Sequence, residues 1–128
     1  MNKGRKVFNG ALVLMLVDVL SQKKVIRVLR FIIKEAPSQE NKRVTAFMID
    51  QAFPEEEKTK NGNKMTELLQ ETGIIEKQSR LSQPQYDREN MFFRVTALYR
   101  ILPKELRQLI EDEKSQILTK KEIEDMLK

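Results

Sequence analysis

The sequence of 128 residues predicts a mainly α-helical protein with one small β-hairpin. Three observations carry this expectation. Apolar residues recur at helical spacing over Lys23–Ala36 and again near Asn63–Thr72. Two short segments, 74–78 and 91–96, read as strands that flank a polar loop, the second being rich in aromatic and β-branched residues. A further helical seam of leucine and isoleucine follows from Leu102 to Ile117.

The first half of the chain predicts three helices. The residues of Ala11–Leu20 are apolar nearly all round, which is typical of a buried helix, often one that faces a partner subunit. The amphipathic helix Lys23–Ala36 ends before Pro37, because proline cannot continue a helix. A third helix is expected at Lys42–Phe53, closed by Pro54. Its expected buried residues are Val44, Phe47, Met48 and Ala52.

The second half begins with a short helix, Asn63–Thr72, for which Asn63 is a suitable N-cap. Gly73 stands where a helix ends in the left-handed conformation. Beyond the hairpin and the seam to Ile117, Thr119 and Glu122 form a capping-box signature that starts a last helix. We expect the aromatic residues Phe92, Phe93 and Tyr99 to anchor the hairpin to the helices rather than to stack on single-stranded bases.

The chain contains no cysteine and no histidine. This excludes a thiol nucleophile, a disulfide framework, a cysteine or histidine zinc site and the Ser-His-Asp triad. The chain also has no glycine-rich phosphate loop, paired-acid motif or nucleophile elbow, so we do not expect an enzyme. The three acids 55–57 point in different directions, and we expect neither a metal nor another cofactor.

The net charge of +5 is unevenly distributed along the chain. Residues 1–34 carry +7 and residues 58–100 carry +3, whereas 35–57 carry −4 and 101–128 carry −1. Two basic blocks separated by an acidic one indicate a surface that faces a polyanion. The apolar run 11–17 has seven residues, too few to cross a bilayer, so we expect a cytoplasmic protein without a membrane partner.

The order of helix, helix, turn, short helix and two-stranded hairpin resembles a winged helix-turn-helix domain. The residues that carry the resemblance are Leu69–Lys77, similar to the end of a recognition helix that runs into a wing strand, and Phe93–Thr96, similar to the return strand. Lys23–Ala36 with the following turn and helix is also similar to plasmid replication proteins of Gram-positive bacteria and to DNA-binding adaptors of plasmid partition. The turn at Pro54–Asn61 is longer and more acidic than is usual in this class.

A recognition helix presents short polar and cationic side chains from its first turn to the edges of bases. The residues that we expect in this role are Lys60, Asn61, Asn63, Lys64 and Thr66. The residues that we expect to reach the DNA backbone or minor groove from the wing are Lys77, Arg80, Gln83 and Arg88. Those that we expect to hold phosphate at the start of the preceding helix are Lys23, Lys24 and Arg27. The alternative interpretation is a solvated face.

These expectations divide the chain into a basic arm with the apolar helix (1–22), a winged helix-turn-helix domain (23–100) and C-terminal helices (101–128). The function that we predict is sequence-specific binding of double-stranded DNA by a homodimer, in transcriptional regulation, plasmid replication or plasmid partition. The candidate dimer surfaces are the helices Ala11–Leu20 and Lys104–Ile117. The alternative is a module that binds a protein partner and not DNA, which the acidic block favours.

Overall fold

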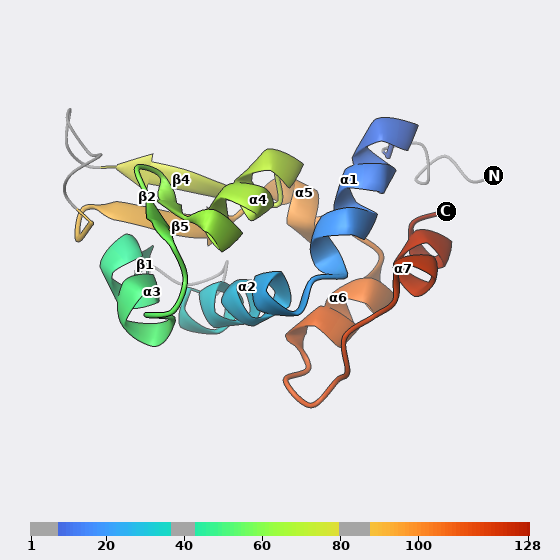
Figure 1. The fold of residues 1–128 in the computed structure, drawn as a ribbon. Helices are drawn as coiled ribbons and strands as arrows, with labels where there is room; N and C mark the ends of the chain where they lie inside the picture. Colours follow the sequence, from blue (N-terminus) through green and yellow to red (C-terminus); the bar gives the residue numbers. More distant parts are fainter. Residues whose placement is uncertain (1–7, 37–42, 80–87) are drawn as a thin grey trace.

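A computed structural model describes residues 8–36, 43–79 and 88–128 of the chain. The described residues are mainly helical and include a small antiparallel sheet, as the sequence predicts (Figure 1). In chain order the elements are α1 (Gly10–Leu20), α2 (Lys23–Glu35), β1 (Val44–Thr45), α3 (Ala46–Ala52), β2 (Lys58–Thr59), β3 (Gly62–Asn63), α4 (Lys64–Thr72), β4 (Ile75–Ser79), β5 (Met91–Val95), α5 (Ala97–Arg100), α6 (Lys104–Glu111) and α7 (Lys120–Leu127).

Helix α2 forms the centre of the molecule. Its apolar stripe includes Val25, Val28, Leu29 and Ile32, and all four side chains are completely buried. Helices α4 and α6 and strand β5 pack against α2 (Figure 1). Complete burial of one such aliphatic side chain stabilises the fold by about 1.5 to 3 kcal/mol, so this helix is a main source of stability.

Helix α1 packs on α7 and also contacts α4 and α2. Its start is capped by Asn9, whose side chain accepts a hydrogen bond from the backbone N–H of Leu12. The helix is not covered on every side, because Leu14 is 68% exposed and Met15 is 40% exposed. One hydrophobic cluster includes Val13, the buried face of α2 and Leu127. Side chains from the three predicted divisions of the chain, 1–22, 23–100 and 101–128, therefore share one core.

The sheet has the strand order β1-β5-β4, and both pairings are antiparallel. The β4–β5 pairing confirms the predicted hairpin, with Ile75 opposite Val95 and Ser79 opposite Met91. Phe92, Phe93 and Tyr99 are buried, with exposed fractions of 8%, 0% and 4%, as expected of anchoring residues. The hydroxyl of Tyr99 donates a hydrogen bond to Glu111, and burial together with this bond raises the pKa of the phenol.

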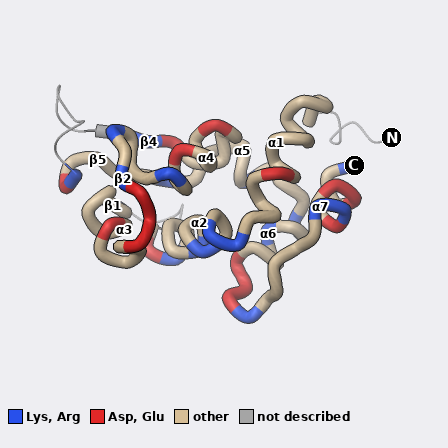
Figure 2. Tube along the Cα trace, viewed as in Figure 1, with Lys and Arg blue, Asp and Glu red and all other residues tan. Residues whose placement is uncertain are grey.

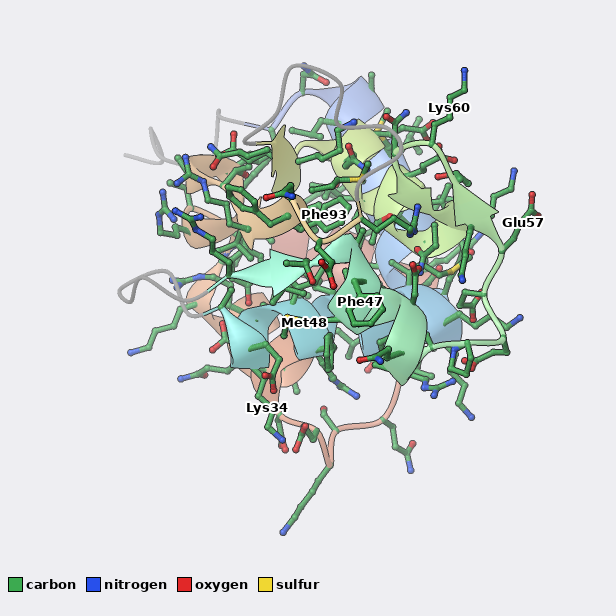
Figure 3. All side chains as sticks on the ribbon, turned by 90° about the vertical axis from the view of Figure 1, so that its left-hand side faces the viewer. Lys34, Phe47, Met48, Glu57, Lys60 and Phe93 are labelled. Atoms are coloured by element: carbon green, nitrogen blue, oxygen red, sulfur yellow. The ribbon has the colours of Figure 1, made fainter. Side chains whose placement is uncertain are left out.

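The predicted helix Lys42–Phe53 is wrong in its first part and in part of its buried face. Val44 and Thr45 instead form β1, where they lie opposite Phe93 and Phe92 of β5. Helix α3 then begins at Ala46, because the hydroxyl of Thr45 accepts a hydrogen bond from the backbone N–H of Met48 and caps the helix. Phe47 is 41% exposed and lies on the outer side of α3 (Figure 3), and Ala52 is also exposed.

The short helix and its two ends are confirmed in α4. Asn63 occupies the N-cap position, and Gly73 ends the helix with a left-handed φ of 84°. The hydroxyl of Thr96 donates a hydrogen bond to the carbonyl oxygen of Gly73, which ties the helix end to the residue after β5. Helix α4 is therefore fixed at its C-terminal end to the base of the hairpin.

The predicted C-terminal helix is shorter than its apolar seam. Helix α6 ends at Glu111, and Ile117 lies outside any helix. Asp112 follows the helix, and its side chain accepts a hydrogen bond from the backbone N–H of Lys114, a local turn that competes with helix continuation. The capping box of Thr119 and Glu122 is confirmed at the start of α7. Hydrogen bonds to the backbone and side chain of Thr119 lower the pKa of Glu122.

Between α3 and α4 the chain forms a second, very short hairpin from β2 and β3. Lys58 lies opposite Asn63 and Thr59 opposite Gly62, which leaves Lys60 and Asn61 as the two turn residues. Gly62 has a φ of 128°, a backbone conformation that favours glycine. In the parts of the chain that the structure describes, no helix has the length and apolar character needed to cross a membrane.

We predict that Gly62→Ala destabilises the protein by about 2 kcal/mol or more, through backbone strain and steric overlap. An added Cβ would lie 2.3 Å from Oγ1 of Thr66 and 2.7 Å from Cζ of Phe93, both in the packed interior. Urea unfolding followed by circular dichroism measures the loss. Gly10→Ala is the matched control, because nothing lies within 4 Å of its added Cβ. Equal unfolding midpoints for the two variants would contradict this account of Gly62.

Candidate nucleic-acid interface

Four lysines and one asparagine gather around the β2–β3 hairpin, and we call this group the hairpin surface: Lys58, Lys60, Asn61, Lys64 and Lys77. All except Lys77, which is half-buried, are exposed. Lys60 extends outward from the edge of the molecule, as does Glu57 nearby (Figure 3). Lys77 joins the group from β4, because its ammonium donates a hydrogen bond of 2.6 Å to the side-chain oxygen of Asn61.

The hairpin tip is held in place by three contacts at Asn61. Its backbone N–H donates to the hydroxyl of Thr59 at 3.2 Å, and its carbonyl oxygen accepts from the side chain of Gln70 at 3.0 Å. The third is the bond from Lys77. Because Gln70 belongs to α4 and Lys77 to β4, the tip is tied to both neighbouring elements. The cations are thus presented from a fixed backbone.

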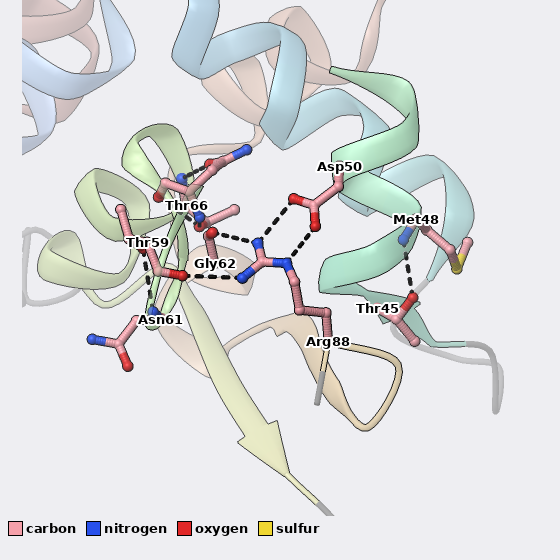
Figure 4. Close-up of polar contacts among 9 residues, drawn as sticks. Thr45, Met48, Asp50, Thr59, Asn61, Gly62, Thr66 and Arg88 are labelled. Atoms are coloured by element: carbon pink, nitrogen blue, oxygen red, sulfur yellow. Dashed lines mark hydrogen bonds and ion pairs between the residues drawn. The ribbon is translucent and has the colours of Figure 1, made fainter. Parts of the chain in front are cut away.

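Arg88, which we predicted as a wing residue that reaches DNA, supports the hairpin surface in the structure. Its guanidinium forms a bidentate ion pair with Asp50 of α3 and donates hydrogen bonds to the carbonyl oxygens of Thr59 and Gly62 (Figure 4). The side chains of Arg88 and Asp50 are only 22% and 8% exposed. Arg88 therefore joins α3 to the hairpin, with four of its five guanidinium N–H groups bonded to these two elements.

Asn63 and Thr66, which we predicted to contact bases, have a structural role at the start of α4. The side-chain oxygen of Asn63 accepts from the backbone N–H of Thr66 at 2.8 Å, and the hydroxyl of Thr66 accepts from the backbone N–H of Asn63 at 2.8 Å. The two residues are 1% and 0% exposed. This reciprocal capping box fixes the start of α4 and uses the polar atoms that we expected to contact bases. Within the described residues, the amide nitrogen of Asn63 and a carboxylate oxygen of Glu56 are buried without a hydrogen-bond partner.

The outward face of α4 is cationic only at its first residue. Lys64 is exposed, but the residues that follow on the same face are Glu67, Leu68 and Glu71. Phosphate would meet two carboxylates along the second and third turns of this helix. Only the N-terminal end of α4, next to the hairpin, is suited to a polyanion.

The three expected phosphate contacts of α2 lie away from the hairpin surface. Lys23, Lys24 and Arg27 are exposed, and Arg27 forms an ion pair of 3.8 Å with Glu55 and lies over the ring of Phe53. The acidic stretch 55–57 runs between α3 and β2, next to the hairpin (Figure 2). Besides the ion pair of Glu55 with Arg27, this stretch contacts the start of α4, since the carbonyl oxygen of Glu57 accepts a hydrogen bond from the backbone N–H of Lys64 at 3.0 Å.

The structure thus brings together four of the predicted residues, namely Lys60, Asn61, Lys64 and Lys77. Arg80 and Gln83 lie outside the described residues. Lys58 belongs to the hairpin surface and was missed by the sequence analysis. The signal was present in the run Lys58–Lys64, where cations flank an Asn-Gly pair, but the sequence predicted only a turn at Pro54–Asn61, and Lys58 instead belongs to a strand.

Comparison of the chain with models of known protein families, with curated protein sequences and with solved structures finds no match. The geometry of the described residues is therefore what any functional conclusion depends on.

We predict that Asp50→Asn destabilises the protein by about 2 to 3 kcal/mol, since it leaves the largely buried Arg88 without its counter-charge. Glu76→Gln is the control, because it removes the carboxylate of the exposed Glu76–Arg94 ion pair and should cost less than about 1 kcal/mol. Chemical denaturation of both variants measures the difference. A similar small loss for both would mean that the Arg88–Asp50 pair does not support the fold.

Proposed function

We propose that the protein is a winged helix-turn-helix protein that binds double-stranded DNA through the hairpin surface. The order α2, α3, α4, β4 and β5 supports this assignment, because it follows the helix, helix, short helix and two-stranded hairpin of that class. The short helix α5 directly after β5 also fits, since the return strand of a wing often precedes a further helix. The departure from the class is the insertion between α3 and α4, which holds the β2–β3 hairpin.

The observation that carries the proposal is the grouping of four lysines on a fixed hairpin. Lysine side chains bind phosphate as point charges, and each neutralised phosphate releases counterions from the duplex. The acids Glu67 and Glu71 on α4 would repel a duplex laid along the whole helix. The duplex is therefore placed across the hairpin and the first turn of α4, where Lys64 is the cation nearest to the helix start.

Sequence-specific reading in this arrangement falls to Lys60, Asn61 and Lys64. Lysine can donate to the O6 and N7 acceptors of guanine, and asparagine can bond adenine in two places. Asn61 already accepts from Lys77, which leaves the second lone pair of its oxygen and its amide NH2 group for adenine. With three residues that could contact bases, one protomer would recognise a short half-site of a DNA sequence. The cellular setting that the class resemblance suggests is transcriptional regulation, plasmid replication or plasmid partition.

A second candidate function is the binding of a protein partner without DNA. The acidic outward face of α4 favours it, because Glu67 and Glu71 occupy the positions from which a recognition helix would meet the duplex. The acidic stretch 55–57 beside the hairpin adds to this negative surface. Absence of DNA binding even at low salt would favour this second function.

We further propose that two copies associate through the uncovered face of α1, which would give the two-fold arrangement that a palindromic site requires. Of the two expected dimer surfaces, α6 packs on α2 within the protomer, whereas Leu14 and Met15 of α1 stay exposed. Sedimentation equilibrium of the protein should give twice the monomer mass. A dissociation constant of about 100 µM is the weakest that would matter for the dimer. A monomer mass at protein concentrations near this value would therefore reject the dimer.

We predict that the triple variant Lys60→Gln, Lys64→Gln and Lys77→Gln binds duplex DNA with a salt slope reduced by about 2 to 3, since each lost phosphate contact removes about 0.9. Fluorescence anisotropy of a labelled duplex at several salt concentrations measures this slope. Its matched control is Lys104→Gln, Lys114→Gln and Lys121→Gln, which removes the same charge from exposed positions elsewhere.

The control triple variant should keep the salt slope of the unmodified protein. An equal reduction in both triple variants would show that binding follows net charge and not the hairpin surface. An unchanged slope in the hairpin variant would also contradict the proposal, because the three substituted lysines would then not touch phosphate.

A further inference from the structure

A groove of about 490 Å³ runs between the first two turns of α2 and the segment that connects α6 to α7. Lys23, Ile26, Arg27 and Arg30 line it from α2, and Ser115, Gln116 and Ile117 line it from the connecting segment. Its volume falls within the range of about 300 to 1,000 Å³ that is usual for small-molecule sites. The groove lies outside the hairpin surface, so it concerns a function beyond the one proposed above.

The groove is strongly cationic, with three basic side chains and no acidic one among its lining residues. The acids of the connecting segment are engaged elsewhere, since Glu113 pairs with Lys34 at 3.8 Å and Asp112 bonds the backbone of Lys114. Among the described residues, Lys23 has no ion-pair partner. Arg27 has only the long and half-exposed pair with Glu55, which adds less than about 1 kcal/mol and is easily exchanged.

Arg30 gives the groove a fixed wall. Its guanidinium donates to the carbonyl oxygens of Ile110, Leu109 and Ser115 at 2.6, 3.2 and 3.3 Å. These bonds hold the connecting segment against α2, although the segment has no regular structure of its own. A wall that is positioned before a ligand arrives lowers the entropy cost of binding.

The remaining lining consists of the polar side chains of Ser115 and Gln116 and of two isoleucines, of which Ile26 is 4% exposed and Ile117 36% exposed. Ile26 and Ile117 belong to the groove and also to a small adjoining pocket of about 10 Å³, whose other walls include Leu20, Leu109 and Leu118. This pocket is too small to admit a ring, so an apolar group would lie on its rim over the two isoleucines. The groove therefore offers a cationic end and an apolar wall together, which is the chemistry that an anion with an apolar body requires.

We infer that this groove binds a small organic phosphate, with the phosphate held by Lys23 and Arg27 and the apolar or aromatic body lying over Ile26 and Ile117. Arginine and lysine are the usual phosphate ligands, and an arginine can bind two phosphate oxygens at once. The phosphate group could belong to a free nucleotide or to the backbone of DNA. The experiment below distinguishes these two sources.

The experiment is isothermal titration of the full chain, without DNA, with three probes: ATP, inorganic pyrophosphate and adenosine. ATP carries both the phosphate and the aromatic body and should bind most tightly. Lys23→Gln should weaken ATP binding by about fivefold or more, the loss of one charge-assisted contact. Lys24→Gln is the matched control, since it removes the same charge from the next residue of α2, which is exposed and does not line the groove.

The variant Ile117→Ser tests the apolar wall and should weaken ATP without changing pyrophosphate. No saturable ATP binding below about 1 mM at low salt would overturn the inference, and so would equal losses in the Lys23 and Lys24 variants. A final experiment tests whether duplex DNA displaces ATP from the protein. If it does, and if Lys23→Gln abolishes the displacement, the groove is assigned to the DNA backbone and the small-molecule site is overturned. These outcomes do not depend on the hairpin surface, so the two proposals fail separately.

Discussion

The candidate interface depends on one buried guanidinium, that of Arg88. Its charge is balanced by Asp50 of α3, and two further donors bond carbonyl oxygens of the β2–β3 hairpin. The backbone carbonyl of Arg88 accepts from the N–H of Phe47, so the same residue is tied to α3 twice. A hairpin with two-residue strands is too short to be stable alone. The Arg88 contacts and the fit of Gly62 against Thr66 and Phe93 are what make this hairpin a rigid support for its lysines.

Polar residues at the start of a helix can either contact a ligand or cap the helix, and α4 contains residues of both kinds. Asn63 and Thr66 are short polar side chains of the kind that read bases, but the same chemistry satisfies the free N–H groups of a helix end. Their burial assigns them to the second purpose. The cations Lys60 and Lys64 flank this cap and remain exposed. The surface that is left for a ligand is therefore more cationic and less capable of hydrogen-bond reading than the sequence alone suggests.

Local signals in the sequence predicted most of the helices and the main hairpin. The apolar period of α2, the N-cap Asn63, Gly73 and the capping box of α7 are all set by neighbouring residues, so sequence reasoning recovers them. Strand β1 was not recoverable in this way, because Val44 and Thr45 become a strand only through pairing with Phe93 and Phe92. The position of the segment that follows α6 is similar, since Arg30 bonds the carbonyl oxygen of Ser115, 85 residues later in the chain.

The same distinction applies to the candidate site. Exposure of Lys60 and Asn61 followed from their place in a polar turn, and that of Lys64 from its place in the first turn of the predicted helix. The buried role of Arg88 did not, because its partner Asp50 lies 38 residues away and no periodic pattern joins them. Lys77 reaches Asn61 across 16 residues for the same kind of reason. A sequence indicates which charges exist, but only the tertiary pairing decides which of them remain for a partner.

The most direct test of the account is the salt dependence of duplex DNA binding by the unmodified protein. Four lysines on the hairpin surface predict that the logarithm of the binding constant falls linearly with the logarithm of salt concentration, with a slope of about −3 to −4 per protomer. Fluorescence anisotropy from low to moderate salt gives this slope. Absence of binding at the lowest salt concentration, or binding that does not change with salt, would contradict the account.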